Sequence, residues 1–227
     1  MEELIAFHGD PKVKAFYLRR VHNHRKADEI IHGKYWENGR GCGVGCTIHS
    51  DDHNAYETEL GIPVQIAYLE DAIFEGMANG KSKEFPERFL KAIKPGVDLS
   101  LVVPRLVVWQ GLDPKHGVIN LVKSNEEREC VKLVAGLYQR IIDGGTVTYQ
   151  EWVDAENQAG AGAWVWARAG ARAGAWAGAR VWVEAWAGAR AGARARVWAG
   201  ARAQPKGQKQ WEILADKFIE LLKSAPV

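Results

Sequence analysis

The chain has 227 residues, 47% of them hydrophobic, and a formal charge of +2, which suits one large globular domain or one domain with an appendage. Three cysteines, Cys42, Cys46 and Cys130, are too few for the disulfide framework of a small secreted protein. No stretch of about 20 residues is both apolar and uncharged, and the start of the chain lacks the basic residues of a signal peptide. We therefore expect a cytoplasmic protein without a membrane span, whose thiols are free or bound to a metal.

The first half of the chain predicts helices with clear end signals. Asp10 followed by Pro11 is typical of a helix start, and Gly33 of a helix end. These signals and the apolar periodicity predict helices over residues 11–32, 46–60, 64–77 and 86–93, with a glycine-rich loop over 35–45.

The second half contains two capping-box patterns, Ser124 with Glu127 and Thr148 with Glu151. The first predicts a helix over 124–142, and an amphipathic pattern predicts another over 211–222. Residues 99–109 fit either a buried helix or a strand, so a short strand pair between 102 and 122 stays open.

Residues 160–203 alternate strictly between Ala or Val and a set made of Gly, Trp, Arg and Glu184. Alternation is typical of strands, but one strand of this length would span on the order of 140 Å. Five glycines fall on one sector of a helix instead, which would let another helix approach closely. We expect a long Ala-rich helix here, with hairpins or several helices as alternatives.

The expected fold is therefore mainly α, with one short strand pair as an addition. We expect a helical body over residues 1–145. Residues 146–227 would add the Ala/Gly/Trp/Arg-rich segment and an amphipathic helix that packs on the body.

The candidate site lies on the first two predicted helices. Arg20, His24 and Asp28 interrupt the apolar stripe of the first, and Asp28 lies one helical turn from His24. The second carries a further polar set on one face, namely Cys46, His49, His53 and Glu57. Antiparallel packing of the two helices would bring both sets together, with Arg20 as the ion-pair partner of Asp28 or Glu57.

Three interpretations of this cluster stay open. In the first, His49 and His53, with Glu57, hold a divalent metal such as zinc, because histidines at i and i+4 project together; Cys42 would support the site. In the second, Cys46 is a nucleophile at a helix start, His24 its base and Asp28 the group that orients His24. In the third, the cluster is a structural network that joins two helices.

A resemblance to a known family covers most of residues 1–142. Three runs carry it: RVHNHRKADEII, YWENGRGCGVGCTIHSDDHNAYETELGIP and LEDAIFEGM. They resemble a group of small uncharacterised bacterial proteins in which RVxxHxxADEII and GCxVGCTxHS precede an Ala-rich stretch and a final amphipathic helix. The resemblance implies a bacterial protein and implies no activity.

Three functions follow as hypotheses. The first is an interaction or regulatory module with a structural cluster, whose protein partner or second copy would bind along the Gly/Ala helix face. The second is a small hydrolase-type enzyme that uses the metal or Cys46. The third is a nucleic-acid binder that uses the Arg and Trp side chains of residues 160–203.

Overall fold

The computed structural model describes residues 4–120, 122, 125–158 and 205–227, and it is mainly helical, as predicted. The described residues of Met1–Ser100 and Ala201–Val227 form one compact unit, and those of Leu101–Gly200 form another. This division differs from the predicted boundary at residue 145. The long helix predicted over 160–203 lies outside the described residues.

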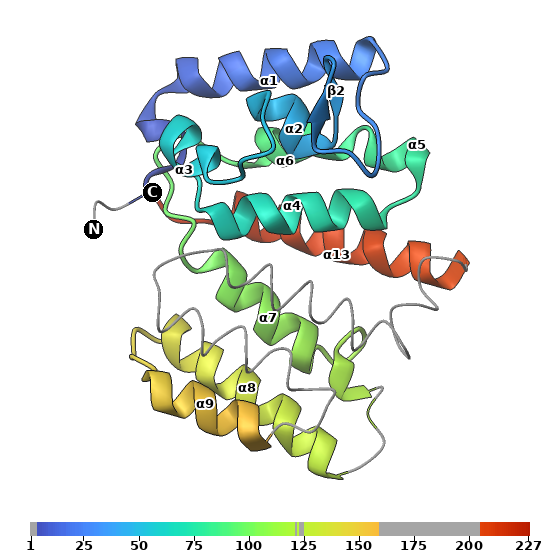
Figure 1. Ribbon diagram of the computed structural model, residues 1–227. Helices are drawn as coiled ribbons and strands as arrows, with labels where there is room; N and C mark the ends of the chain where they lie inside the picture. The colour runs from blue at the N-terminus through green and yellow to red at the C-terminus, as the bar shows by residue number, and fades with distance from the viewer. Residues whose placement is uncertain (1–3, 121, 123–124, 159–204) are drawn as a thin grey trace. The chain divides into compact units, whose positions relative to one another are not determined.

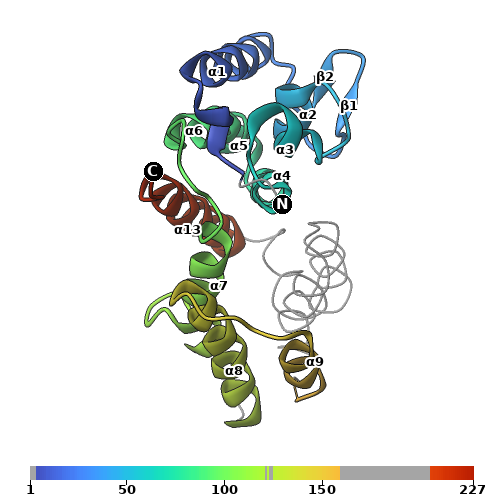
Figure 2. The ribbon, with the colours of Figure 1, turned by 90° about the vertical axis from the view of Figure 1, so that its left-hand side faces the viewer.

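The first unit contains one 3₁₀ helix, seven of the described α-helices and a two-stranded antiparallel sheet. Their bounds are η1 (Ala6–Gly9), α1 (Pro11–Lys26), β1 (Trp36–Glu37), β2 (Arg40–Gly41), α2 (Gly43–Ile48), α3 (Ala55–Leu60), α4 (Val64–Gly76), α5 (Asn79–Ser82), α6 (Phe85–Ala92) and α13 (Pro205–Lys223). Figures 1 and 2 show α2 between α1 and α4, with α6 beside it. All six residues of α2 are buried, so this short helix lies at the centre of the unit.

α1 ends at Lys26, six residues before the predicted end. The backbone turns at Asp28, whose φ is 58°, and Ile30 then pairs with Gly41 of β2. Ile30 is completely buried. A contact made far along the chain therefore overrides the local helical pattern.

The single helix predicted over 46–60 is wrong, because the chain forms α2 and α3 with a bend between them. α2 ends at His49 in the left-handed conformation, with φ 56°. Ser50 and Asp52 then hydrogen-bond backbone N–H groups two residues on, at 3.1 and 3.0 Å. Such side chains compete with helical hydrogen bonds, and here they win.

Part of the predicted glycine loop is helical, since α2 begins at Gly43. The close packing around this segment leaves no room for a side chain at its glycines. A β-carbon on Gly45 would lie 1.5 Å from the carbonyl oxygen of Tyr35, and one on Gly41 would lie 2.0 Å from the same atom. A β-carbon on Gly43 would lie 2.8 Å from a carboxylate oxygen of Glu70. The glycines therefore let α2 pack against backbone on one side and α4 on the other.

The helices predicted over 64–77, 86–93 and 211–222 are confirmed as α4, α6 and α13. α13 completes the core of the first unit against α4 and α6. The Phe218 ring stacks on Phe89 at 5.8 Å between centroids, and Trp211 covers Gly76.

The second unit is formed by α7 (Val102–Leu112), η2 (Val118–Asn120), α8 (Asn125–Ile142) and α9 (Tyr149–Gln158). Residues 102–112 are helical, so the strand pair considered between 102 and 122 is wrong, and the sheet of the described chain lies at 36–41 instead. The capping box of Thr148 and Glu151 forms as predicted, with reciprocal hydrogen bonds of 2.8 and 3.3 Å. No helix in the described part of the chain has the length and apolar character needed to cross a membrane.

Candidate functional site

His24 and His49 meet as the sequence analysis expected, at the face between α1 and α2. Their Nε2 atoms lie 2.7 Å apart, and the ring planes are nearly perpendicular. His24 is held near the end of α1, and its side chain is only 13% exposed. His49 caps α2 and is exposed, so it is the part of the pair that solvent reaches.

Glu29, not Asp28, orients His24. Its Oε2 atom lies 2.6 Å from His24 Nδ1, which gives a continuous chain of contacts from Glu29 through His24 to His49. Because α1 ends before Asp28, the Asp28 side chain points to solvent and pairs with Lys83, which lowers the pKa of Asp28. The predicted contact between His24 and Asp28 is therefore wrong.

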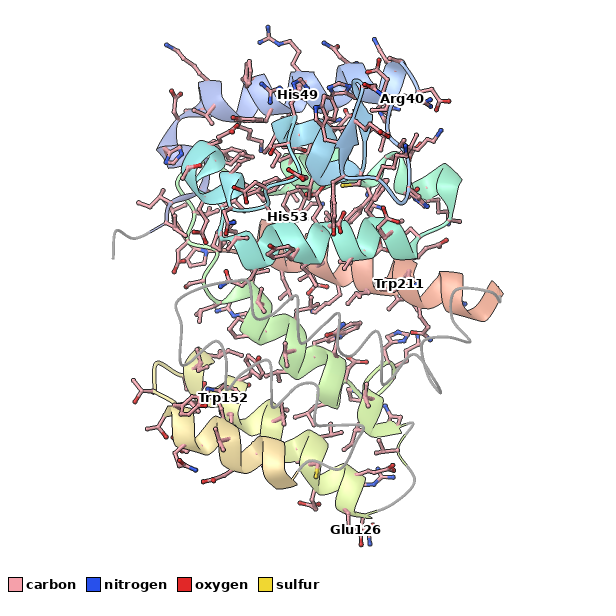
Figure 3. All side chains as sticks on the ribbon, in the orientation of Figure 1. Arg40, His49, His53, Glu126, Trp152 and Trp211 are labelled. Carbon is pink, nitrogen blue, oxygen red and sulfur yellow. The ribbon has the colours of Figure 1, made fainter. Side chains whose placement is uncertain are left out.

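Trp36 holds the ring of His49 in place. Its indole stacks on His49 with 4.4 Å between centroids and 9° between planes, and it meets His24 edge-on. Figure 3 labels His49 beside α1 and Arg40 at the neighbouring turn of the sheet. The hairpin of β1 and β2 therefore supplies one wall of the site.

Arg20 lies close to the pair but forms neither predicted ion pair. Its Nη1 donates to the carbonyl oxygen of Thr47 at 2.9 Å, and its guanidinium stacks over the rings of Phe16 and Tyr17. Partial desolvation of the ring by its neighbours, and then the positive charges of Arg20 and His24, lower the pKa of His49. The neutral form of His49 is favoured as a result.

Cys46 of α2 and Cys42, which caps the start of that helix, are both buried. Cys46 donates its thiol hydrogen to the carbonyl oxygens of Gly41 and Glu29, at 3.4 and 3.8 Å. Burial raises the pKa of Cys46 to about 12, so a thiolate at the helix start, which the nucleophile hypothesis needs, is disfavoured. Cys42 accepts a hydrogen bond from Gly45 N, and burial together with Asp71 raises its pKa as well.

His53 and Glu57 do not join His49. His53 is buried, stacks on Tyr68 at 4.3 Å, and has Nδ1 3.2 Å from a backbone carbonyl oxygen. Figure 3 shows it above α4, away from His49. Glu57 accepts the N–H of Val64 and so caps α4. Among the described residues, no three His, Cys, Asp or Glu side chains are placed to hold a metal ion, so the predicted zinc-type ligand set is not assembled there.

A buried acid behind α2 was missed by the sequence analysis. Glu70 on α4 is completely buried, and its Oε2 accepts the hydroxyl of Tyr56 at 2.6 Å. Burial raises the pKa of Glu70 to about 8; the Tyr56 hydrogen bond opposes this rise, and the charge of Asp71 adds to it. The signal was present in the sequence, since residue 70 lies one turn from both Ile66 and Phe74 on the apolar stripe of α4.

Comparison with known proteins adds no relative to this picture. No protein-family model matches the chain, and no curated protein or solved structure matches it either.

Proposed function

We propose that the protein is an interaction or regulatory module, and that the chain Glu29–His24–His49 makes the charge of its surface depend on pH. The supporting observation is the 2.7 Å contact between the two Nε2 atoms. At this distance one Nε2 carries a hydrogen and the other a lone pair, so the contact depends directly on protonation.

The Glu29 carboxylate determines which ring nitrogens of the two histidines carry a hydrogen. Glu29 accepts from Nδ1 of His24, so Nε2 of His24 is the acceptor and Nε2 of His49 is the donor in the neutral pair. A first added proton still leaves a lone pair on one of the two Nε2 atoms, so the contact persists. A second proton places hydrogen on both Nε2 atoms, and the contact breaks.

Protonation of His49 adds positive charge where α1 ends. Because the pKa of His49 lies below its ordinary value of 6.5, this charge develops as the pH falls below that value. Separation of the rings would also free the Trp36 indole that stacks on His49. A partner that recognises either change would bind in a pH-dependent way.

The enzyme alternatives depend on an accessible thiolate at Cys46 or on a metal shared by His49 and His53. The Cys46 thiol is buried with a raised pKa, and His49 and His53 face different neighbours. The exposed end of the site is an imidazole, which suits a change of charge better than attack on a substrate.

Nuclear magnetic resonance of the full chain tests the proposal. Between pH 8 and pH 4, the backbone amides of Glu29, Trp36 and His49 should shift together in two steps, because the pair titrates as one unit. His24→Gln should collapse the two steps into one. The control His8→Asn alters an exposed histidine of the same unit and should leave both steps in place. The proposal would lose its basis if these amides shifted independently of one another, or if their pH dependence were the same in His24→Gln.

A further inference from the structure

α1 is the most basic element of the first unit. Its 16 residues contain six lysines and arginines and no aspartate or glutamate. One side of the helix buries Tyr17 and Val21 in the unit, and the opposite side is open to solvent. A concentration of one sign of charge on an exposed helix is the electrostatic pattern of a surface that binds a polyanion.

Three of the six cations are held by the unit itself. Lys14 donates to the carbonyl oxygens of Lys91 and Ile93, Arg20 donates to that of Thr47, and Arg25 pairs with Glu87 at 2.7 Å. The other three, Lys12, Arg19 and Lys26, are exposed, and no described residue forms an ion pair with their side chains. Within the described part of the chain, no ion pair gives these three cations a role in stabilising the fold.

Lys12, Arg19 and Lys26 lie on one face, because each follows the last by seven residues, or two helical turns. At 1.5 Å per residue, neighbouring cations are about 10 Å apart along α1, and the row is about 21 Å long. This spacing is close to the screening length of physiological salt, so a single phosphate or carboxylate beside one cation is largely screened from the next. The face therefore suits a ligand that repeats its negative charge.

Phe16 lies between the first two cations and is 51% exposed. The Arg20 guanidinium covers its ring at 4.6 Å from the centroid, and Tyr17 meets it edge-on. A membrane surface is a poor match, because a helix that enters a bilayer needs a free apolar face and that of α1 is buried. An exposed aromatic ring among cations is instead the arrangement on which bases of a single strand stack.

We propose that the face of α1 formed by Lys12, Phe16, Arg19 and Lys26 binds single-stranded nucleic acid, with phosphates at the cations and a base on the Phe16 ring. This inference rests on the proposed interaction role and names the class of partner. It involves α1 and is independent of the Arg and Trp residues of 160–203.

Fluorescence anisotropy of the full chain with a labelled oligothymidylate of about 20 nucleotides tests this proposal. The variant Lys12→Gln/Arg19→Gln/Lys26→Gln is compared with Lys94→Gln/Lys209→Gln/Lys223→Gln, which removes the same charge from exposed positions elsewhere in the unit. The binding test is done at pH 8, where His49 is neutral because its pKa is lowered. Failure of the binding test therefore leaves the proposal about the histidine pair standing, and failure of the titration test leaves the binding proposal standing.

We expect the α1 variant to bind at least tenfold more weakly at low salt and the control variant to bind within threefold of the parent. The slope of log affinity against log salt should become shallower by about 2 in the α1 variant, since each phosphate contact on a single strand contributes about 0.7. Phe16→Ala should weaken binding by roughly fivefold or more without changing that slope.

Three results would overturn the proposal: no binding by the parent, equal weakening of both triple variants, or an α1 dependence seen only with anionic phospholipid vesicles or polyglutamate.

Discussion

Replacing Glu70 with glutamine should make the protein more stable at pH 8 and leave its stability at pH 5 nearly unchanged. The glutamine carbonyl can still accept the hydroxyl of Tyr56, so the hydrogen bond at 2.6 Å is retained. The substitution removes only the ability of a completely buried side chain to ionise.

The size of the effect follows from the difference between the folded and unfolded pKa. Glu70 has a pKa of about 8 when folded, against 4.5 for the ordinary group. Between these values the folded state keeps a proton that the unfolded state releases, so the free energy of unfolding falls as the pH rises. At about 1.4 kcal/mol per pH unit, the wild-type protein should lose about 3 to 4 kcal/mol between pH 5 and pH 8 through this group alone.

Urea denaturation at pH 5, 6, 7 and 8, followed by circular dichroism, measures this difference. The midpoint of Glu70→Gln should exceed that of the wild type by about 2 M urea at pH 8, for a slope near 2 kcal/mol/M, and should match it at pH 5. The same change at the exposed Glu84 is the control and should leave the pH profile as it is. Parallel profiles for wild type and Glu70→Gln would refute the idea that a neutral carboxyl is buried behind α2.

Three further predictions concern packing and thiol reactivity. Gly45→Ala should destabilise the chain by about 3 kcal/mol or more, because its β-carbon would lie 1.5 Å from a backbone oxygen; an unchanged melting temperature would contradict the packing of α2. Gly76→Ala should displace Trp211 and lower the melting temperature, whereas Gly136→Ala, in open space on α8, should raise stability by up to about 1 kcal/mol; equal effects would count against the docking of α13. Cys46 should react with iodoacetamide at pH 8 only after urea is added, as peptide mass spectrometry can show, and fast labelling of the folded protein would mean that its thiol is accessible.

Much of the fold could be predicted because local signals and tertiary packing agree over most helices. α4, α6 and α13 have continuous apolar stripes, and α9 has a capping box that forms as written. The wrong predictions fall where local signals and tertiary packing disagree. The pairing of Ile30 with Gly41 ends α1 early, and the left-handed turn at His49 divides the predicted second helix. Neither contact has a periodic signal in the sequence.

The candidate site was predictable only in part for the same reason. The meeting of His24 and His49 depends on the packing of α1 against α2, which the interrupted stripe of α1 indicated. The role of Glu29 could not be predicted, because it requires the turn at Asp28 that brings the carboxylate back to the end of α1. Glu70 could have been recognised, since an acid in the middle of an apolar stripe has few explanations other than burial.

The last helix packs on segments made much earlier, and this order matters during synthesis. Phe89 leaves the ribosome long before Phe218, which later stacks on it. At about 5 to 20 residues per second, the delay is roughly 5 to 25 s. Throughout that interval the nascent chain presents the apolar faces of α4 and α6 that α13 will cover, so chaperones have time to bind them. Completion of this unit is therefore a late event, which follows translation of the intervening hundred or so residues.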